Sequence, residues 1–212
     1  MVIFMKQSEK SQITYNKILN SAIKEFGTKN YDSASINNIC SDNDISKGLI
    51  YHNFKNKDEL YLRCTEEAFK SLLEFLEGNE YEGVSFSESM KKLIDSRYEF
   101  FSKNTYYSHI FFNAVLQPPK HLAGEIKEIR SSLDEFNQRQ YRSMLKDVTL
   151  RDGISPDEAL SYFLIFQEMF NGYYQRRAYE QADFHSLIKE HELALSKILN
   201  IMLYGIAKEK EL

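Results

Sequence analysis

The stretch from Ser35 to Lys57, SINNICSDNDISKGLIYHNFKNK, constrains the fold of this chain more than any other part of the sequence. Three apolar residues that follow Ser35 have the i, i+3, i+4 spacing of one helix face, and serine is a good N-cap for such a helix. The Ser, Asp and Asn side chains at 41–44 can bond to nearby backbone, and Asp and Asn tolerate left-handed dihedrals, so this polar run predicts a tight turn. Ser46 then caps a second short helix, predicted over 47–53.

The predicted second helix is too short and too weakly apolar to form a core by itself. Ile45 and Ile50 can turn inward, which leaves an outward face made of Lys47, Gly48, Leu49, Tyr51 and His52. Two short helices joined by such a turn form a helix-turn-helix, whose second helix enters the major groove of DNA. The stretch therefore predicts a DNA-binding element.

The same stretch resembles the signature of the TetR family of bacterial transcriptional regulators. The resemblance is carried by Ile45-Ser46-Lys47-Gly48, Ile50-Tyr51-His52, Phe54, Lys55-Asn56-Lys57 and Leu60. It implies that Tyr51 contacts the DNA backbone and that Lys57 binds a phosphate, which also suits a lysine at a helix N-terminus. It further implies base reading by Lys47, Gly48 and Leu49, and the remaining DNA-binding candidates are Ser35, Asn37, His52 and Lys55.

Two positions depart from the family pattern. Leu49 stands where a small hydroxyl residue is usual, so we expect it to touch thymine methyl groups rather than to donate a hydrogen bond. Asn43-Asp44 replaces the usual Ala-Gly of the turn. Asp44 can hold a left-handed conformation, but it adds a negative charge near the DNA.

Composition excludes several other classes of protein. The chain has 212 residues, 42% of them hydrophobic, and three prolines, as expected of a globular protein. Its apolar runs are shorter than the ~20 residues that cross a bilayer, so we expect no membrane association. The apolar segment from Met1 to Met5 lacks the features of a signal peptide, and Met5 is an alternative start of the chain. Two cysteines without metal-ligand spacing indicate reduced thiols in a cytoplasmic protein.

Charge is distributed unevenly along the chain, whose net charge is −4. Residues 1–57 carry eight lysines and five acids, whereas residues 58–212 carry nineteen basic and twenty-six acidic side chains. A modestly basic N-terminal part on an acidic body suits a protein that touches DNA at one end only.

Helical patterns account for the chain without any strand alternation, which predicts an all-α fold of about nine helices. A helix over 8–26 gives the helix-turn-helix a core, so residues 1–55 are predicted to form a three-helix DNA-binding head. Residues 56–212 are predicted to form a helical domain for ligand binding and dimerisation. Its helices are expected over 57–76, 86–101, 106–116, 121–148, from Pro156 onward and over 184–207.

The last two helices predict a homodimer. The segment Ala159 to Tyr174 is apolar or aromatic on nearly every side, and a peripheral helix of one subunit could not bury all of these faces. Two helices from each subunit would instead make a four-helix bundle. The interface candidates are Tyr162, Phe163, Phe170, Tyr173, Leu195, Ile198 and Met202, and His191 is also expected at this interface.

The family resemblance implies a pocket for a small effector inside the helical domain. Arg97, His109 and Gln140 lie on stripes that should be apolar, and with Phe112, Phe136 and Phe166 they are the lining candidates. A satisfied core polar group or a buried ion pair is an equally good explanation for each polar member.

These observations together indicate a dimeric repressor that binds a palindromic operator in double-stranded DNA and is released by an unknown small effector, apolar or aromatic in character. One alternative is a DNA-binding dimer without a small ligand, controlled by a protein partner or constitutive. A remote alternative is a helical metal-binding enzyme. No HExxH, P-loop or GxGxxG motif occurs, so we expect no catalytic residues, metal or cofactor.

Overall fold

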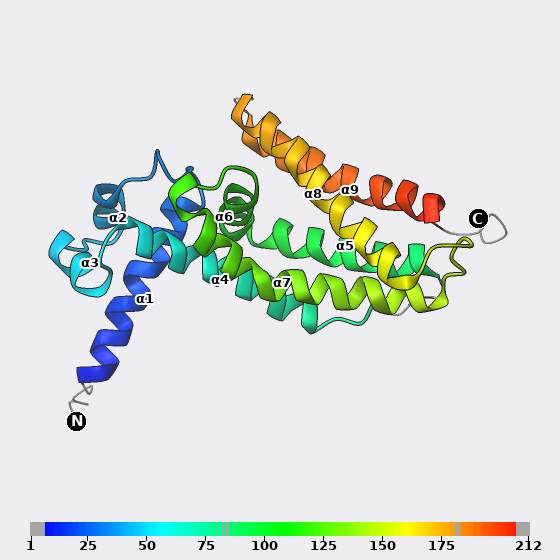
Figure 1. Ribbon diagram of the computed structural model, residues 1–212. Coiled ribbons are helices and arrows are strands. Elements are labelled where there is room, and N and C mark those ends of the chain that lie inside the picture. Colours follow the sequence, from blue (N-terminus) through cyan, green and yellow to red (C-terminus); the bar gives the residue numbers. More distant parts are fainter. Residues whose placement is uncertain (1–6, 82, 84, 181–182, 207–212) are drawn as a thin grey trace. The chain divides into compact units, whose positions relative to one another are not determined.

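The computed structural model describes residues 7–81, 83, 85–180 and 183–206. Over these residues the chain is helical and contains no β-strand, which confirms the predicted all-α fold (Figure 1). The helices are α1 (Gln7–Phe26), α2 (Ile36–Asp42), α3 (Lys47–Asn53), α4 (Lys57–Glu77), α5 (Phe86–Lys103), α6 (Thr105–Leu116), α7 (Ala123–Met144), α8 (Pro156–Glu180) and α9 (Phe184–Ile206).

One predicted helix differs from the structure. The segment 121–148 is not a single α-helix, because α7 is flanked by the short 3-10 helices η1 (Lys120–Leu122) and η2 (Leu145–Asp147). Pro118 and Pro119 precede η1, and the Leu122 amide bonds back to the Pro119 carbonyl in the tighter i to i+3 pattern. The last predicted residue of α9, Ala207, lies outside the described residues.

The chain forms two compact units. The first contains α1 to α3 with the chain up to Phe69, together with Asn104–Ala114 and Pro118–Ile129. The second contains Lys70–Lys103, Val115–Gln117 and the chain from Arg130 onward. The predicted boundary between residues 55 and 56 separates a DNA-binding domain from a domain for ligand binding and dimerisation, and this division of function stays a prediction.

The core of the first unit is built where α1 packs on α2 and α2 packs on α3. Ile39, Ile45 and Ile50 are buried, as their spacing predicts. Phe54, the residue that ends α3, is buried and stacks on Tyr15 of α1 with ring centroids 5.2 Å apart. Apolar contacts with α1 therefore fix both short helices.

The carboxylate of Glu25 ties the end of α1 to the start of α2. Its Oε1 accepts hydrogen bonds from the Ser35 amide at 2.9 Å, from Asn38 Nδ2 at 3.0 Å and from Lys29 Nζ at 2.9 Å. Burial acts to raise the pKa of Glu25, but these hydrogen bonds outweigh it and hold that pKa below its ordinary value.

The second unit contains α8 and α9 side by side, with α5 packed against α9 (Figure 1). A buried polar network joins these three helices. Arg97 of α5 donates to Glu192 Oε1 at 3.3 Å, and His191 Nδ1 lies 3.1 Å from the same oxygen. His191 Nε2 lies 3.2 Å from Asn171 Oδ1 of α8. Burial alone would raise the pKa of Glu192, but the Arg97 guanidinium and the His191 ring lower it to about 2.

Gly27 is required by a close approach inside the first unit. A Cβ at this position would lie 2.5 Å from both the Ile23 carbonyl oxygen and Tyr106 Cβ of α6. We expect Gly27→Ala to lower the free energy of unfolding by about 2 kcal/mol or more, because a packed backbone would have to shift. The matched control is Gly124→Ala on α7, where no atom lies within 4 Å. Gly124→Ala should raise the free energy of unfolding by up to about 1 kcal/mol, since alanine favours the helix. Urea unfolding measures both variants, and equal effects of the two changes would contradict this account.

The buried ion pair gives a second prediction. Arg97→Met should lower the free energy of unfolding by about 3–5 kcal/mol, because it leaves the Glu192 carboxylate buried without its guanidinium partner. The double variant Arg97→Met, Glu192→Gln should recover most of this loss. In the wild type the stabilisation from the low pKa of Glu192 should be complete above about pH 4.5 and should be lost as pH falls toward 2. Acid unfolding monitored by circular dichroism measures both effects, and an unchanged acid midpoint in the double variant would contradict the assignment.

Candidate nucleic-acid interface

Side-chain caps and one left-handed residue set the geometry of the helix-turn-helix. Ser35 Oγ accepts from the Asn37 amide at 3.2 Å at the start of α2, and Ser46 Oγ accepts from the Leu49 amide at 3.2 Å at the start of α3. Between the helices, Asp44 has φ of +50°, the left-handed conformation expected for this turn. The predicted bounds of α3, its cap and its inward residues are all confirmed.

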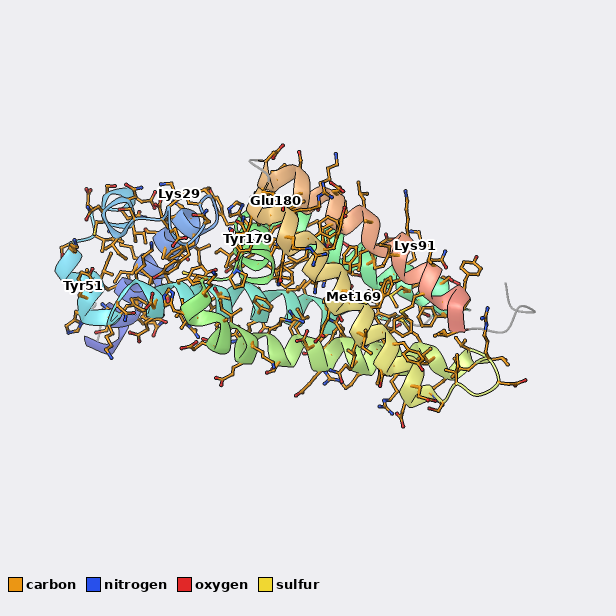
Figure 2. The ribbon with its side chains drawn as sticks, turned by 45° about the horizontal axis from the view of Figure 1, so that its top comes forward. Lys29, Tyr51, Lys91, Met169, Tyr179 and Glu180 are labelled. Atoms are coloured by element: carbon orange, nitrogen blue, oxygen red, sulfur yellow. The ribbon has the colours of Figure 1, made fainter. Side chains whose placement is uncertain are left out.

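The outward face of α3 is available to a partner. The five residues predicted to face outward are all exposed, with Leu49 38% and Tyr51 47% accessible: Lys47, Gly48, Leu49, Tyr51 and His52. Figure 2 shows Tyr51 at the outer edge of the helix-turn-helix. A Cβ on Gly48 would meet no atom within 4 Å, so the fold itself does not require glycine there.

The flanking candidates differ in exposure. Asn37 and Lys55 are exposed, whereas Ser35 is half-buried and its hydroxyl oxygen accepts from the Asn37 amide. Lys57 is half-buried at the first position of α4. Contact of these residues with DNA stays a prediction.

The N-terminus of α4 is partly capped by its own side chains. Asn56 Oδ1 accepts from the Glu59 amide at 2.9 Å, and Glu59 Oε2 accepts from the Lys55 amide at 2.5 Å. The bond to Asn56 is the N-cap half of a capping box, whereas the Glu59 carboxylate reaches the amide one residue before the N-cap. The Glu59 amide is therefore less available to a phosphate. Phosphate binding at this end would therefore depend mainly on the Lys57 side chain and the remaining amides.

Three residues absent from the sequence-based candidates surround Lys57 in the first unit. The Lys57 ammonium lies over the ring of Tyr31, 4.3 Å from its centroid. The Tyr31 hydroxyl donates to Asp58 Oδ1, and His121 Nε2 of η1 lies 3.2 Å from the same oxygen. No periodic pattern identifies these contacts, because Tyr31 and His121 lie outside the α-helices.

The electrostatics of this cluster follow from its geometry. Burial and the neighbouring Asp58 carboxylate raise the pKa of Tyr31, so its hydroxyl stays protonated. The hydrogen bond from Tyr31 holds the pKa of Asp58 below its ordinary value, so the carboxylate stays charged. Burial lowers the pKa of Lys57, against the attraction of nearby carboxylates.

The six predicted effector-pocket residues divide between the two units. His109 and Phe112 belong to the first unit, and the other four belong to the second. Arg97 takes part in the buried ion pair with Glu192, which is the alternative that the sequence left open. Gln140 lines an open, largely polar pocket of about 680 Å³ in the second unit. Phe112 and Phe136 are buried, and His109 and Phe166 are half-buried.

Two of the residues predicted at the dimer interface lie in the core of the subunit instead. Phe163 and Phe170 are buried within the subunit, where Phe163 stacks between Phe86 and Tyr141 and Phe170 packs on Tyr174 and His191. The sequence also predicts His191 at the interface, but it is buried in the same core against Phe170.

An exposed apolar stripe nevertheless runs along α8. It consists of Tyr162, Ile165, Met169 and Tyr173, which recur at intervals of three or four residues, and Met169 is 66% accessible. Figure 2 labels Met169 on α8. On α9, Leu193, Ile201 and Tyr204 are exposed, while Leu195, Ile198 and Met202 are half-buried. Because α8 is apolar or aromatic on nearly every side, the sequence offers no signal that separates its outward residues from Phe163 and Phe170.

Neither a metal site nor a membrane span is found in the part of the chain that the structure describes. Among its His, Cys, Asp and Glu side chains, no group of three is placed to hold a metal ion. None of its helices combines the length and apolar character needed to cross a bilayer.

The left-handed residue of the turn yields a prediction that separates backbone from charge. Asp44→Gly should raise the free energy of unfolding by about 1 kcal/mol, since glycine adopts this φ without a Cβ penalty. Asp44→Asn tolerates the same conformation and should leave stability unchanged. Both changes remove a negative charge beside α3, so both should tighten DNA binding at low salt in fluorescence anisotropy. Weaker binding by both variants would show that the carboxylate makes a favourable contact.

Comparison with known proteins agrees with this geometry. Residues 18–64 match the family described as bacterial regulatory proteins, tetR family. The negative transcriptional regulator IcaR of the icaADBC biofilm operon of Staphylococcus epidermidis is 26% identical over 173 residues, 78% of this chain and 85% of IcaR. The HTH-type transcriptional regulator UidR of Escherichia coli is 28% identical over 149 residues, 69% of this chain and 72% of UidR.

A solved structure extends the likeness of fold to almost the whole chain. The regulator FadR of Bacillus subtilis, in complex with stearoyl-CoA, has a TM-score of 0.63 at 16% identity and covers 91% of this chain and 99% of its own. The matched family segment contains α2 and α3 with their exposed face, and both sequence relatives extend beyond it into the helical body. The chain therefore belongs to the TetR family and is a DNA-binding transcriptional regulator.

Proposed function

We propose that the protein is a cytoplasmic repressor that binds a palindromic operator as a homodimer and leaves it when a small effector binds the helical body. The observation that carries this proposal is the exposed face of α3. Its side chains take no part in the core, because the buried Ile50 packs the helix from the other side. A surface helix with no internal use for its lysine, tyrosine and histidine is suited to a nucleic-acid partner.

On the DNA, α3 would lie in the major groove. Lys47 would reach guanine edges, Leu49 would contact a thymine methyl group, and Gly48 would let the helix approach closely. Tyr51 and Lys57 would contact phosphates on either side of the reading face and fix its register. Asn37, Ser35, His52 and Lys55 would add contacts at the rim.

Dimerisation would cover the apolar stripe of α8. Tyr162, Ile165, Met169 and Tyr173 leave a contiguous helical strip exposed in one subunit, and such a strip marks a protein interface. A twofold axis through α8 and α9 would repeat the strip on the partner and pair the two recognition helices. Half-sites would then lie one DNA turn, roughly 34 Å, or a multiple of it apart.

Two relatives support repression and its release. IcaR is named a negative regulator, which supports a repressor. FadR was solved with stearoyl-CoA, whose acyl chain supports an effector with an apolar part. In this proposal the pocket lies in the second unit, where Phe136 and Phe166 would supply apolar lining and Gln140 a polar contact. To change operator occupancy from 99:1 to 1:99, the effector must favour the released state by about 5.5 kcal/mol.

The experiment is selection of genomic DNA fragments by the purified protein, followed by binding measurements on the enriched site. The wild type should retain fragments that share a palindrome, as a dimer in analytical ultracentrifugation. Lys47→Ala should weaken binding by about 1–3 kcal/mol and relax base preference while leaving the dimer intact. Met169→Asp should give a monomer with much weaker operator binding, because a charge would be buried in the interface.

The matched control is Tyr98→Asp, which places the same charge on an exposed residue of α5, 55% accessible and outside the α8 stripe. It should leave both assembly and DNA binding unchanged. A wild type that remains monomeric at micromolar concentration and enriches no fragment at low salt would overturn the proposal.

A further inference from the structure

The surroundings of Lys57 hold its side chain in one place. Tyr31, in the loop between α1 and α2, offers its ring face to the Lys57 ammonium at 4.3 Å. The ring is itself fixed, because it packs edge-on against Tyr61 at 5.1 Å and against His121 at 5.6 Å. Tyr61 is buried in α4, so the support comes from the core of the first unit.

The carboxylate beside Lys57 is occupied by other partners. Asp58 Oδ1 accepts from the Tyr31 hydroxyl and lies 3.2 Å from His121 Nε2. A free carboxylate next to a lysine would compete with DNA for the ammonium, and the carboxylates of Asp32, Asp58 and Glu25 all attract it. Among the ion pairs of the described residues, Asp58 pairs with His121 and Glu25 pairs with Lys29, rather than either with Lys57.

We infer that Tyr31 is a positioning residue for DNA binding: its ring seats the Lys57 ammonium toward an operator phosphate, while its hydroxyl and His121 together keep Asp58 from capturing that ammonium. The inference rests on the proposed function, in which Lys57 contacts a phosphate. Tyr31 itself need not touch DNA. A cation held against an aromatic face keeps its charge and loses little freedom when it meets a phosphate.

The arrangement also gives η1 a role in DNA binding. His121 follows α6 after a short linker that contains Pro118 and Pro119, and proline restricts backbone motion. His121 bonds Asp58, the residue next to Lys57. Loss of this contact would loosen Asp58 and lower operator affinity without altering the reading face of α3.

The test is a double-mutant cycle on the full-length protein with its selected operator, measured as the dissociation constant across a range of KCl concentrations. Loss of one phosphate contact lowers the slope of log K against log salt by about 0.9. Lys57→Gln should show this loss and roughly tenfold weaker binding at fixed salt. Tyr31→Leu should show the same slope change, and the double variant should lose nothing further.

Two other variants separate positioning from general damage. Tyr31→Phe keeps the ring under Lys57 but removes the hydroxyl that bonds Asp58, so its salt slope should lie between those of the wild type and Tyr31→Leu. Tyr98→Leu removes an exposed tyrosine from α5 of the second unit and should change nothing. Thermal unfolding of every variant shows whether the first unit stays folded.

If Tyr31→Leu is folded and keeps the wild-type slope, or if its loss adds fully to that of Lys57→Gln, the inference fails while the proposed function stands. Should Tyr31→Leu not fold, NMR of the wild type decides the matter: the Lys57 side-chain protons should be shifted upfield by the Tyr31 ring, and unshifted signals would overturn the inference. A wild type that binds no operator defeats the proposed function instead.

Discussion

The structure depends first on the burial of two seven-residue helices against α1. Isolated helices of this length are marginal in water, because nucleation fixes several residues for one hydrogen bond. Here Ile39, Ile45 and Ile50 are buried where α1 packs on α2 and α2 packs on α3, and Phe54 closes the end of α3 against Tyr15. Only because these four side chains hold the helices can the opposite face of α3 carry residues with no structural use.

Polar groups complete this packing at points where the backbone changes direction. Glu25 accepts the amide of Ser35 at the start of α2, and Ser46 caps α3. Each bond satisfies a donor that a short helix leaves open at its N-terminus. Lys57 is held in a similar way. The side chains of Asn56 and Glu59 bond the backbone at the start of α4, while the Tyr31 ring contacts the Lys57 ammonium.

Buried charge is treated differently in the second unit. The Arg97 and Glu192 pair lies in the core with His191 and Asn171, so α5, α8 and α9 share one polar network. Replacing such a pair by apolar packing of the same volume is often neutral or stabilising, whereas removing one partner leaves a buried charge and is costly. The sequence predicts that Arg97 lines an effector pocket. In the structure it joins α5 to α9 through Glu192 instead.

The sequence by itself determined the local features: the all-α class, the bounds of α3, its inward isoleucines, its caps and its outward residues. These follow from hydrophobic spacing and from capping chemistry, both of which act within a few residues of the chain. It also anticipated the left-handed turn at Asp44, because the choice of side chain there is set by backbone sterics.

Only the tertiary structure decided which sides of α8 are covered, since Phe163 and Tyr162 are adjacent in sequence yet one is buried and the other exposed. It alone brought Tyr31, Lys57 and His121 together across 90 positions of sequence, and Arg97 to Glu192 across 95. Contacts of this kind are set by how helices pack, and the periodicity of a single helix does not record which neighbour will face it.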